Sequence, residues 1–213
     1  MYVPRHFEEN DPKVLRDAIR AIGPGHLITV GPSAPMATFM PFVISDDAMT
    51  LTGHLAKGNE QWKLATSSSS ALVCWVGPHA YISPSYYATK AETGRVVPTW
   101  DYIAIQARGM VTFHDDSAWL RAQVNALTDT HEATRPEPWA LADAPSDYVE
   151  AQLRGIVGVS IHITSLQGSW KLSQNKSVAD IIGVLCGLEL EGTPATTATA
   201  AAVAERTRDA RKA

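Results

Sequence analysis

Three segments of the sequence carry side chains that could bind an anion or a planar ring, and the first contains His54, Lys57 and Asn59. There a predicted strand runs into a predicted helix. Free backbone N–H groups at a helix N-terminus, together with a lysine and an amide side chain, suit a phosphate or a carboxylate. His54 could coordinate a metal or a haem iron, or it could be a hydrogen-bonded structural residue. The segment therefore predicts an anion site and leaves the role of His54 open.

The second segment covers residues 77–100 and is rich in aromatic side chains and prolines. We expect an irregular loop here, and loops of this length in compact domains tend to be functional. Its rings could form one wall of a planar-ligand site, and they could equally anchor the loop to the core or contact a second copy of the chain. The rings are those of Tyr81, Tyr86, Tyr87 and Trp100.

The third segment, residues 168–176, places several hydrogen-bond donors at the end of a predicted strand. These donors could clamp a phosphate or a carboxylate. The alternative is a solvated turn before a helix that Ser177 caps. The donors are Lys171, Ser173, Gln174, Asn175 and Lys176.

Composition excludes several classes of protein. The 213 residues contain 18 Lys and Arg against 22 Asp and Glu, which gives a net charge of −4 and an isoelectric point near 5.9. Without a long basic run, the sequence lacks the charge that non-specific binding to nucleic acid requires. No apolar run approaches the ~20 residues of a membrane-spanning helix, and no signal peptide is evident. Cys74 and Cys186 are expected to be buried thiols in a reducing cytoplasm.

Hydrophobic periodicity and turn residues predict antiparallel strands with helices before, between and after them. The helices are expected at residues 12–22, 57–65, 117–131, 145–156 and 177–188. The strands are expected at residues 26–31, 37–44, 48–55, 71–77, 101–114 and 158–164, with a loop at residues 67–70. The alternating pattern of residues 101–114 predicts one long strand, bent at Gly109. This order favours an α+β, mainly β fold, an antiparallel barrel with flanking helices, over a doubly wound sheet.

The chain is expected to form one domain over residues 1–188. From Glu189 onward, alanine and threonine dominate until the charged end at residues 205–212. Such a stretch has little to bury, so residues 189–213 are predicted to be a tail that is disordered or loosely helical.

Five motifs in a fixed order distinguish the sequence. They are Met1-Tyr2-Val3-Pro4 with Phe7, Gly53-His54 with Asn59-Glu60-Gln61-Trp62, GPHAYISPSYY, VPTWDY and WKLSQNK. Together they resemble the PaiB family, commonly labelled FMN-binding negative transcriptional regulators, from Met1 to about Leu188. The resemblance implies a six-stranded antiparallel split β-barrel with flanking helices, and a homodimer that binds FMN at the subunit interface.

Matched motif by motif, the resemblance also implies which residues contact the cofactor. They are Thr38 and Met40 on a strand, His54, Lys57 and Asn59 near the phosphate, and Trp62, Tyr81, Ile82, Ser83, Lys171, Ser173, Gln174 and Asn175 as further contributors. Two positions depart from the family, which usually has Asn at Asp101 and often His at Gln106. Gln106 cannot carry a proton or bind a metal as a histidine could. No catalytic residue is identified.

The family is also similar to haem-dependent piperazate synthases, which keep the split barrel and close an N–N bond in a hydroxylated ornithine. In that alternative the cofactor is haem b and His54 is its axial ligand. The intact block at residues 83–100 is more similar to the regulator branch. We therefore expect a cytoplasmic FMN-binding flavoprotein that acts as an indirect transcriptional regulator, a flavin-linked sensor or an oxidoreductase on a small molecule.

Other possibilities stay open at this stage. A binding protein without a cofactor is the third hypothesis, and the sequence does not decide whether the protein is an enzyme. Direct contact with DNA is not expected, because no helix pair carries the basic recognition helix of a helix-turn-helix. The only local excess of positive charge lies at the C-terminal end.

Overall fold

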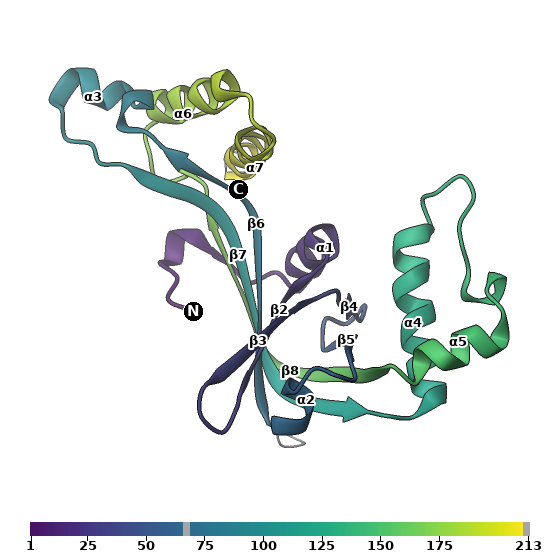
Figure 1. The fold of residues 1–213 in the computed structure, drawn as a ribbon. Coiled ribbons are helices and arrows are strands. Elements are labelled where there is room, and N and C mark those ends of the chain that lie inside the picture. The colour runs from purple at the N-terminus through teal and green to yellow at the C-terminus, as the bar shows by residue number, and fades with distance from the viewer. Residues whose placement is uncertain (66–68, 211–213) are drawn as a thin grey trace. The chain divides into compact units, whose positions relative to one another are not determined.

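The computed structural model describes residues 1–65 and 69–210 (Figure 1). Its backbone falls into two compact units, each built from separated stretches of chain. The first unit contains Met1–Asn10, Val76–Ile105 and Gln167–Ala213, and the second contains Asp11–Trp75 and Gln106–Leu166. Residues 1–188, which were expected to form one domain, are distributed over both units. Three long strands continue from one unit into the other, namely β6 (Ser70–Ile82), β7 (Thr99–His114) and β8 (Ile156–Lys171).

The described strands form one mostly antiparallel sheet of eight, flanked by helices. The order is β3-β2-β6-β7-β8-β5-β4, and β1 pairs with β8 outside this path. The shorter strands are β1 (Glu8–Glu9), β2 (Gly25–Val30), β3 (Pro35–Met40), β4 (Val43–Ile44) and β5 (Thr50–Ala56). Every pair with a defined register is antiparallel, with His54 of β5, for example, opposite Gly158 of β8. The antiparallel α+β fold is confirmed, but eight strands replace the predicted six and the path of pairs does not close.

Several strands end where the sequence does not predict an end. The strand expected at residues 37–44 breaks after Met40, because Pro41 has no N–H to donate to a ladder, and the chain resumes as β4. β6 runs on through residues 77–82, where a loop was predicted. The long alternating strand is confirmed as β7. A Cβ on Gly109 would lie 2.1 Å from the backbone oxygen of His162, so only glycine allows the neighbouring strand this close.

The second unit carries helices α1 (Pro12–Ile22), α2 (Gln61–Leu64), α4 (Ser117–Glu132) and α5 (Ser146–Leu153). The predicted start of α1 is confirmed, since the Asp11 side chain accepts a hydrogen bond from Lys13 N at 2.8 Å and Pro12 occupies the first position. α2 is shorter than the predicted helix at residues 57–65. Lys57 N donates instead to Gly155 O at 2.8 Å, and this bond holds residue 57 outside the helix.

Helix α4 packs against β5 and β4 within the second unit, and α5 lies beside α4 (Figure 1). Asp116 caps α4 by accepting a hydrogen bond from Trp119 N at 2.8 Å. A Cβ on Gly158 would meet the Trp119 ring at 2.1 Å, so the absent side chain makes room for the indole. Leu120, Val149 and Leu153 form the buried core between the two helices.

The first unit contains the 3-10 turns η1 (Arg5–Phe7) and η2 (Pro84–Tyr86) and helices α3 (Ala88–Thr93), α6 (Val178–Glu191) and α7 (Pro194–Ala210). The predicted loop of residues 77–100 is therefore partly regular structure. Ser177 caps α6 as predicted, by accepting a hydrogen bond from Asp180 N at 3.1 Å. One buried hydrophobic cluster of this unit consists of Ala80, Ile82, Tyr87, Val184, Leu188 and Ala200.

The C-terminal segment differs from the predicted tail, because α7 lies against α6 and buries part of its surface (Figure 1). Thr199 and Val203 are fully buried, and Ala200 joins the core cluster. The sequence predicted little burial here because alanine and threonine are small. The same small side chains allow α7 to approach α6 closely, so this composition permits burial. Arg206 also pairs with Glu9 at 2.7 Å.

Two other expectations need correction or fall outside the described residues. Cys186 is exposed on α6 and Cys74 is half-buried, so the prediction of two buried thiols is wrong; both are free thiols. Of the loop predicted at residues 67–70, residues 67 and 68 are not described, and Ser70 begins β6. Among the helices of the described ranges, none has both the length and the apolar character to cross a bilayer.

Candidate functional site

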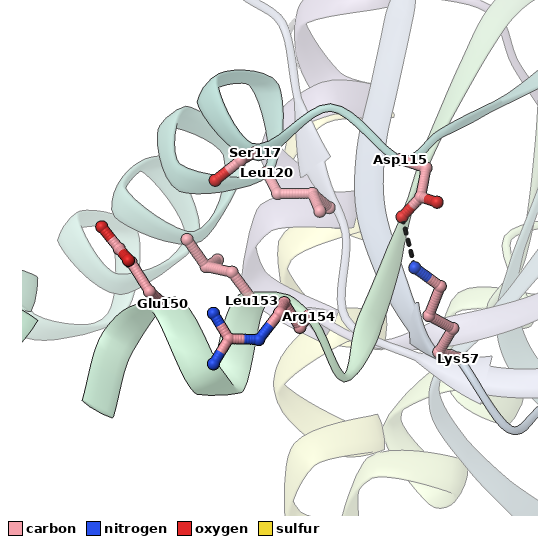
Figure 2. Close-up of a pocket in the computed structure, with 7 residues that line it drawn as sticks. All are labelled: Lys57, Asp115, Ser117, Leu120, Glu150, Leu153 and Arg154. Carbon is pink, nitrogen blue, oxygen red and sulfur yellow. Dashed lines mark hydrogen bonds and ion pairs between the residues drawn. The ribbon is translucent and has the colours of Figure 1, made fainter. Parts of the chain in front are cut away.

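A cavity of about 370 Å³ in the second unit brings together opposite charges from three parts of the chain (Figure 2). We call it the Lys57 cavity. Lys57 follows β5, Asp115 follows β7, and Ser117 begins α4. The Lys57 ammonium lies 2.6 Å from the Asp115 carboxylate. Glu150, Leu153 and Arg154 reach the same cavity from the C-terminal part of α5 and the residue after it.

Local structure explains why these groups meet. The bond from Lys57 N to Gly155 O ties the end of β5 to the chain just after Arg154. Asp116 fixes the start of α4, so Ser117 lies at the positive end of a 16-residue helix. The Arg154 guanidinium has no hydrogen bond or ion pair with any residue in the described ranges. The cavity offers an anion two cations, a hydroxyl and a helix start, and it also contains the carboxylates of Asp115, which pairs with Lys57, and of Glu150.

A second group of predicted residues forms an internal hydrogen-bond network around Gln61. Thr38 Oγ1 donates to Gln61 Oε1 at 2.6 Å and accepts from Asn59 Nδ2 at 2.9 Å. Asn59 Oδ1 also accepts from Gln61 N at 2.9 Å. Gln61 is 1% exposed, and its Nε2 donates to Leu27 O, Thr29 Oγ1 and Met36 O. The hydrogen-bonding groups of Thr38 and Asn59 are therefore largely used to attach α2 to strands β2 and β3.

Met40 and Trp62 have packing roles in this unit. Met40 is buried, and a Cβ on Gly53 would lie 2.5 Å from Met40 Cε. Trp62 Nε1 donates to Lys57 O at 2.9 Å. This bond attaches the indole to the backbone that carries the Lys57 ammonium, so Trp62 helps to position the Lys57 cavity.

His54 lies on β5 and points to α4. Its Nδ1 lies 2.8 Å from Gln123 Oε1, and Gln123 is 4% exposed. Nearby on the same sheet, His114 stacks on Trp119 with the ring centres 4.1 Å apart and bonds Ser160 Oγ at 2.7 Å. Burial lowers the pKa of His114, while Asp116 opposes this shift.

The other predicted site residues belong to the first unit, where Lys171 is the centre of a polar group. Lys171 Nζ donates to Thr99 Oγ1 at 2.7 Å and to Trp100 O, and lies 3.9 Å from Asp101 Oδ1. Ser173, whose backbone is left-handed with φ +59°, donates to Asp101 Oδ2 at 2.6 Å. Burial lowers the pKa of Lys171, against the attraction of Asp101.

The remaining predicted contacts of the first unit are more dispersed. Tyr81 is half exposed, with its ring edge-on to Trp100 at 6.0 Å, whereas the Ile82 side chain is fully buried in the core. Ser83 caps η2 by accepting from Ser85 N. Gln174 bonds the backbone at Leu172, Trp170 and His6, and Asn175 is exposed. The structure thus groups Lys171 with Ser173 and places Tyr81 beside Trp100.

Sequence reasoning missed four residues that define these sites. Gln61 was part of a motif, but nothing in the sequence showed that its amide would be the centre of a network. Asp115 pairs with Lys57, Gln123 bonds His54, and Arg154 lines the same cavity as Lys57. The two residues of each pair lie 58 to 97 positions apart in the chain. No local pattern in the sequence marks these three residues.

The antiparallel sheet and its flanking helices define a split-barrel protein. The chain belongs to the family described as "Putative FMN-binding domain", whose model matches residues 1–165, and FMN is the cofactor that this membership assigns. It is 31% identical over 196 residues to the protease synthase and sporulation protein PAI 2 of Bacillus subtilis, with 91% of this chain and 92% of the relative covered.

Solved structures support the fold. The FAD and heme binding protein of Mycobacterium smegmatis matches 78% of this chain and 73% of its own, with a TM-score of 0.59 and 14% identity. The flavocytochrome Anf3 of Azotobacter vinelandii matches 79% of this chain and 72% of its own, with a TM-score of 0.59 and 12% identity. These likenesses confirm the split-barrel architecture.

The residues of the Lys57 cavity fit the phosphate end of FMN. Lys57 and Arg154 supply positive charge, Ser117 supplies a hydroxyl, and the Arg154 guanidinium has no partner among the described residues. A phosphate is held by such donors in charge-assisted hydrogen bonds. The donor set therefore agrees with the cofactor of the family.

The buried carboxylate of Asp101 leads to a prediction about pH. Burial raises the pKa of Asp101, although Ser173 and Lys171 partly oppose this shift, and its Oδ1 has no hydrogen-bond partner among the described residues. Between the unfolded pKa of 3.8 and the higher folded pKa, the folded state binds more protons, so wild type loses stability as pH rises. We expect Asp101→Asn to gain on the order of 1 kcal/mol relative to wild type from about pH 4 to pH 7 in urea unfolding.

A control of opposite sign is available in the same unit. The backbone hydrogen bond from Thr89 N lowers the pKa of Asp180, so wild type should lose stability relative to Asp180→Asn as pH falls below about 4, whereas the two should run nearly parallel from pH 4 to pH 7. Parallel pH curves for wild type and Asp101→Asn would contradict the prediction.

Proposed function

We propose that this protein binds FMN with the phosphate in the Lys57 cavity and works as a flavin-linked sensor or oxidoreductase. The observation that carries the proposal is the meeting of Lys57, Ser117 and Arg154 around one cavity, where the Arg154 guanidinium has no partner among the described residues. When bound, the isoalloxazine ring supplies the electron chemistry, and the protein supplies binding and orientation.

The residues of the chain have distinct tasks in this proposal. Lys57 and Arg154 bind the phosphate, and Asp115 holds the Lys57 ammonium at the cavity when the phosphate is absent. The Gln61 network and the Trp62 bond to Lys57 O position the segment that carries Lys57. In the first unit, Lys171, Ser173 and Tyr81 are proposed as further cofactor contacts.

We also propose that any effect on transcription is indirect. The net charge of −4 does not favour the phosphate backbone of DNA, and a sensed ligand or a protein partner would carry the effect. Tight, salt-sensitive and sequence-specific binding of DNA by the purified protein alone would contradict this. The half-exposed rings of Tyr81 and Trp100 support a homodimer, and we propose that this dimer acts in the cytoplasm.

The absorption spectrum of the purified full-length chain tests the proposal. We expect the chain, mixed with FMN and passed through a desalting column, to retain about one FMN per chain and to show the double band of bound flavin. Failure to retain any flavin would overturn the proposal. A Soret band that disappears in His54→Ala would instead support the haem alternative.

A further inference from the structure

A second cavity in the second unit has a different character from the Lys57 cavity. It measures about 260 Å³ and lies between α4, α5 and the connection that joins them. Its apolar wall includes Val124, Trp139, Leu141, Val149 and Ile156. None of the described residues that line it is Asp, Glu, Lys or Arg. Such a wall disfavours a charged ligand, because a charge would lose its hydration without gaining a partner.

His54 supplies a directed polar group at this cavity. Its Nδ1 lies 2.8 Å from Gln123 Oε1, and a carboxamide oxygen only accepts, so Nδ1 carries the proton in this arrangement. In the tautomer that carries its proton on Nδ1, Nε2 is the hydrogen-bond acceptor of the ring. Gln123 is buried, and its Nε2 has no partner among the described residues. A ligand that donates one hydrogen bond would therefore use His54 Nε2, an acceptor that the described residues leave available.

The volume limits the size of the ligand. An engineered apolar cavity of about 150 Å³ binds benzene, and pockets for drug-sized molecules span roughly 300–1,000 Å³. A cavity of about 260 Å³ therefore suits one substituted ring and is small for a three-ring flavin. Trp139 and Tyr148 are about half exposed at this cavity, so a small molecule can reach it from solvent.

We propose that this cavity binds a neutral, mainly apolar compound of about one ring that donates a single hydrogen bond to His54 Nε2. The site is separate from the Lys57 cavity, although Leu153 lines both. The proposal does not depend on FMN, since it rests on the shape and chemistry of this second cavity alone.

Titration of the purified full-length chain with phenol and with toluene, followed by ligand-observed NMR, tests the proposal. Both probes should bind, because both fill the apolar wall, whereas benzoate should bind at least about tenfold more weakly. Ala144→Phe places a ring in the cavity and should weaken both probes at least tenfold. Ala142→Phe is the matched control, since Ala142 is exposed on the same segment and does not line the cavity.

The role of His54 is tested by a ratio. In His54→Leu, the ratio of phenol affinity to toluene affinity should fall about fivefold, which corresponds to the net free energy of one hydrogen bond. Toluene should still bind, and this would show that the cavity is intact. Absence of phenol binding, equal effects of Ala144→Phe and Ala142→Phe, an unchanged ratio in His54→Leu, or benzoate binding as tight as phenol would each overturn the proposal. Flavin absorbance of the same samples reports FMN separately, so failure of either proposal is distinguishable.

Discussion

We expect Lys57→Ala to weaken the binding of FMN by roughly 100-fold and to leave the binding of riboflavin nearly unchanged. The two flavins differ only in the phosphate, and a hydrogen bond from a cation to a phosphate contributes about 1.5–3 kcal/mol. The variant also removes the partner of Asp115, which leaves an unpaired carboxylate beside the phosphate. Both effects act on FMN alone, and fluorescence titration of the purified protein with each flavin measures them.

Matched variants make this result specific. Lys63→Ala removes a lysine from α2, and the Lys63 ammonium contacts only the Trp62 ring among the described residues, so FMN should bind normally. Lys57→Arg keeps the charge and should retain most of the affinity, whereas Arg154→Gln should lose FMN selectively. If Lys57→Ala reduces the affinity for FMN and riboflavin equally, Lys57 does not bind the phosphate.

Much of the fold was predictable because its signals are local. Pro12 after an acidic cap defined the start of α1, and strict alternation defined β7. The same reasoning failed where tertiary contacts decide the structure. Residues 77–82 continue β6 despite Gly77 and Pro78, and the Ala- and Thr-rich α7 is buried only because α6 lies beside it. Composition alone cannot show a partner that is far away in the sequence.

The candidate sites show the same limit. Lys57 and Lys171 were predictable as donors, but their acceptors were not, because Asp115, just after β7, and the backbone of Trp100, within β7, lie far from these lysines in the sequence. Thr38 and Asn59 were predicted as ligand contacts, and the structure uses both in the Gln61 network. A polar side chain near a motif can thus bind a ligand or hold the elements that position it. Only the contacts separate these roles.

Gln61→Leu should destabilise the protein by about 3 kcal/mol, because it removes every side-chain bond of a fully buried amide. The carbonyls of Leu27 and Met36 and the hydroxyls of Thr29 and Thr38 would then lack this partner. Each polar group left unsatisfied in the interior costs about 1–3 kcal/mol, and partial relaxation keeps the total below the sum. Urea unfolding followed by circular dichroism measures the loss.

Gln152→Leu is the matched control for this effect, since Gln152 is exposed on α5 and has no side-chain hydrogen bond to the described residues. Its stability should stay within about 0.5 kcal/mol of wild type. The two variants make the same chemical change, so a difference between them reports the buried network and not the loss of an amide. The network also fixes Asn59, two residues from Lys57, so Gln61→Leu should weaken FMN binding under conditions where it remains folded. Equal unfolding midpoints for both variants would show that α2 is held by packing alone.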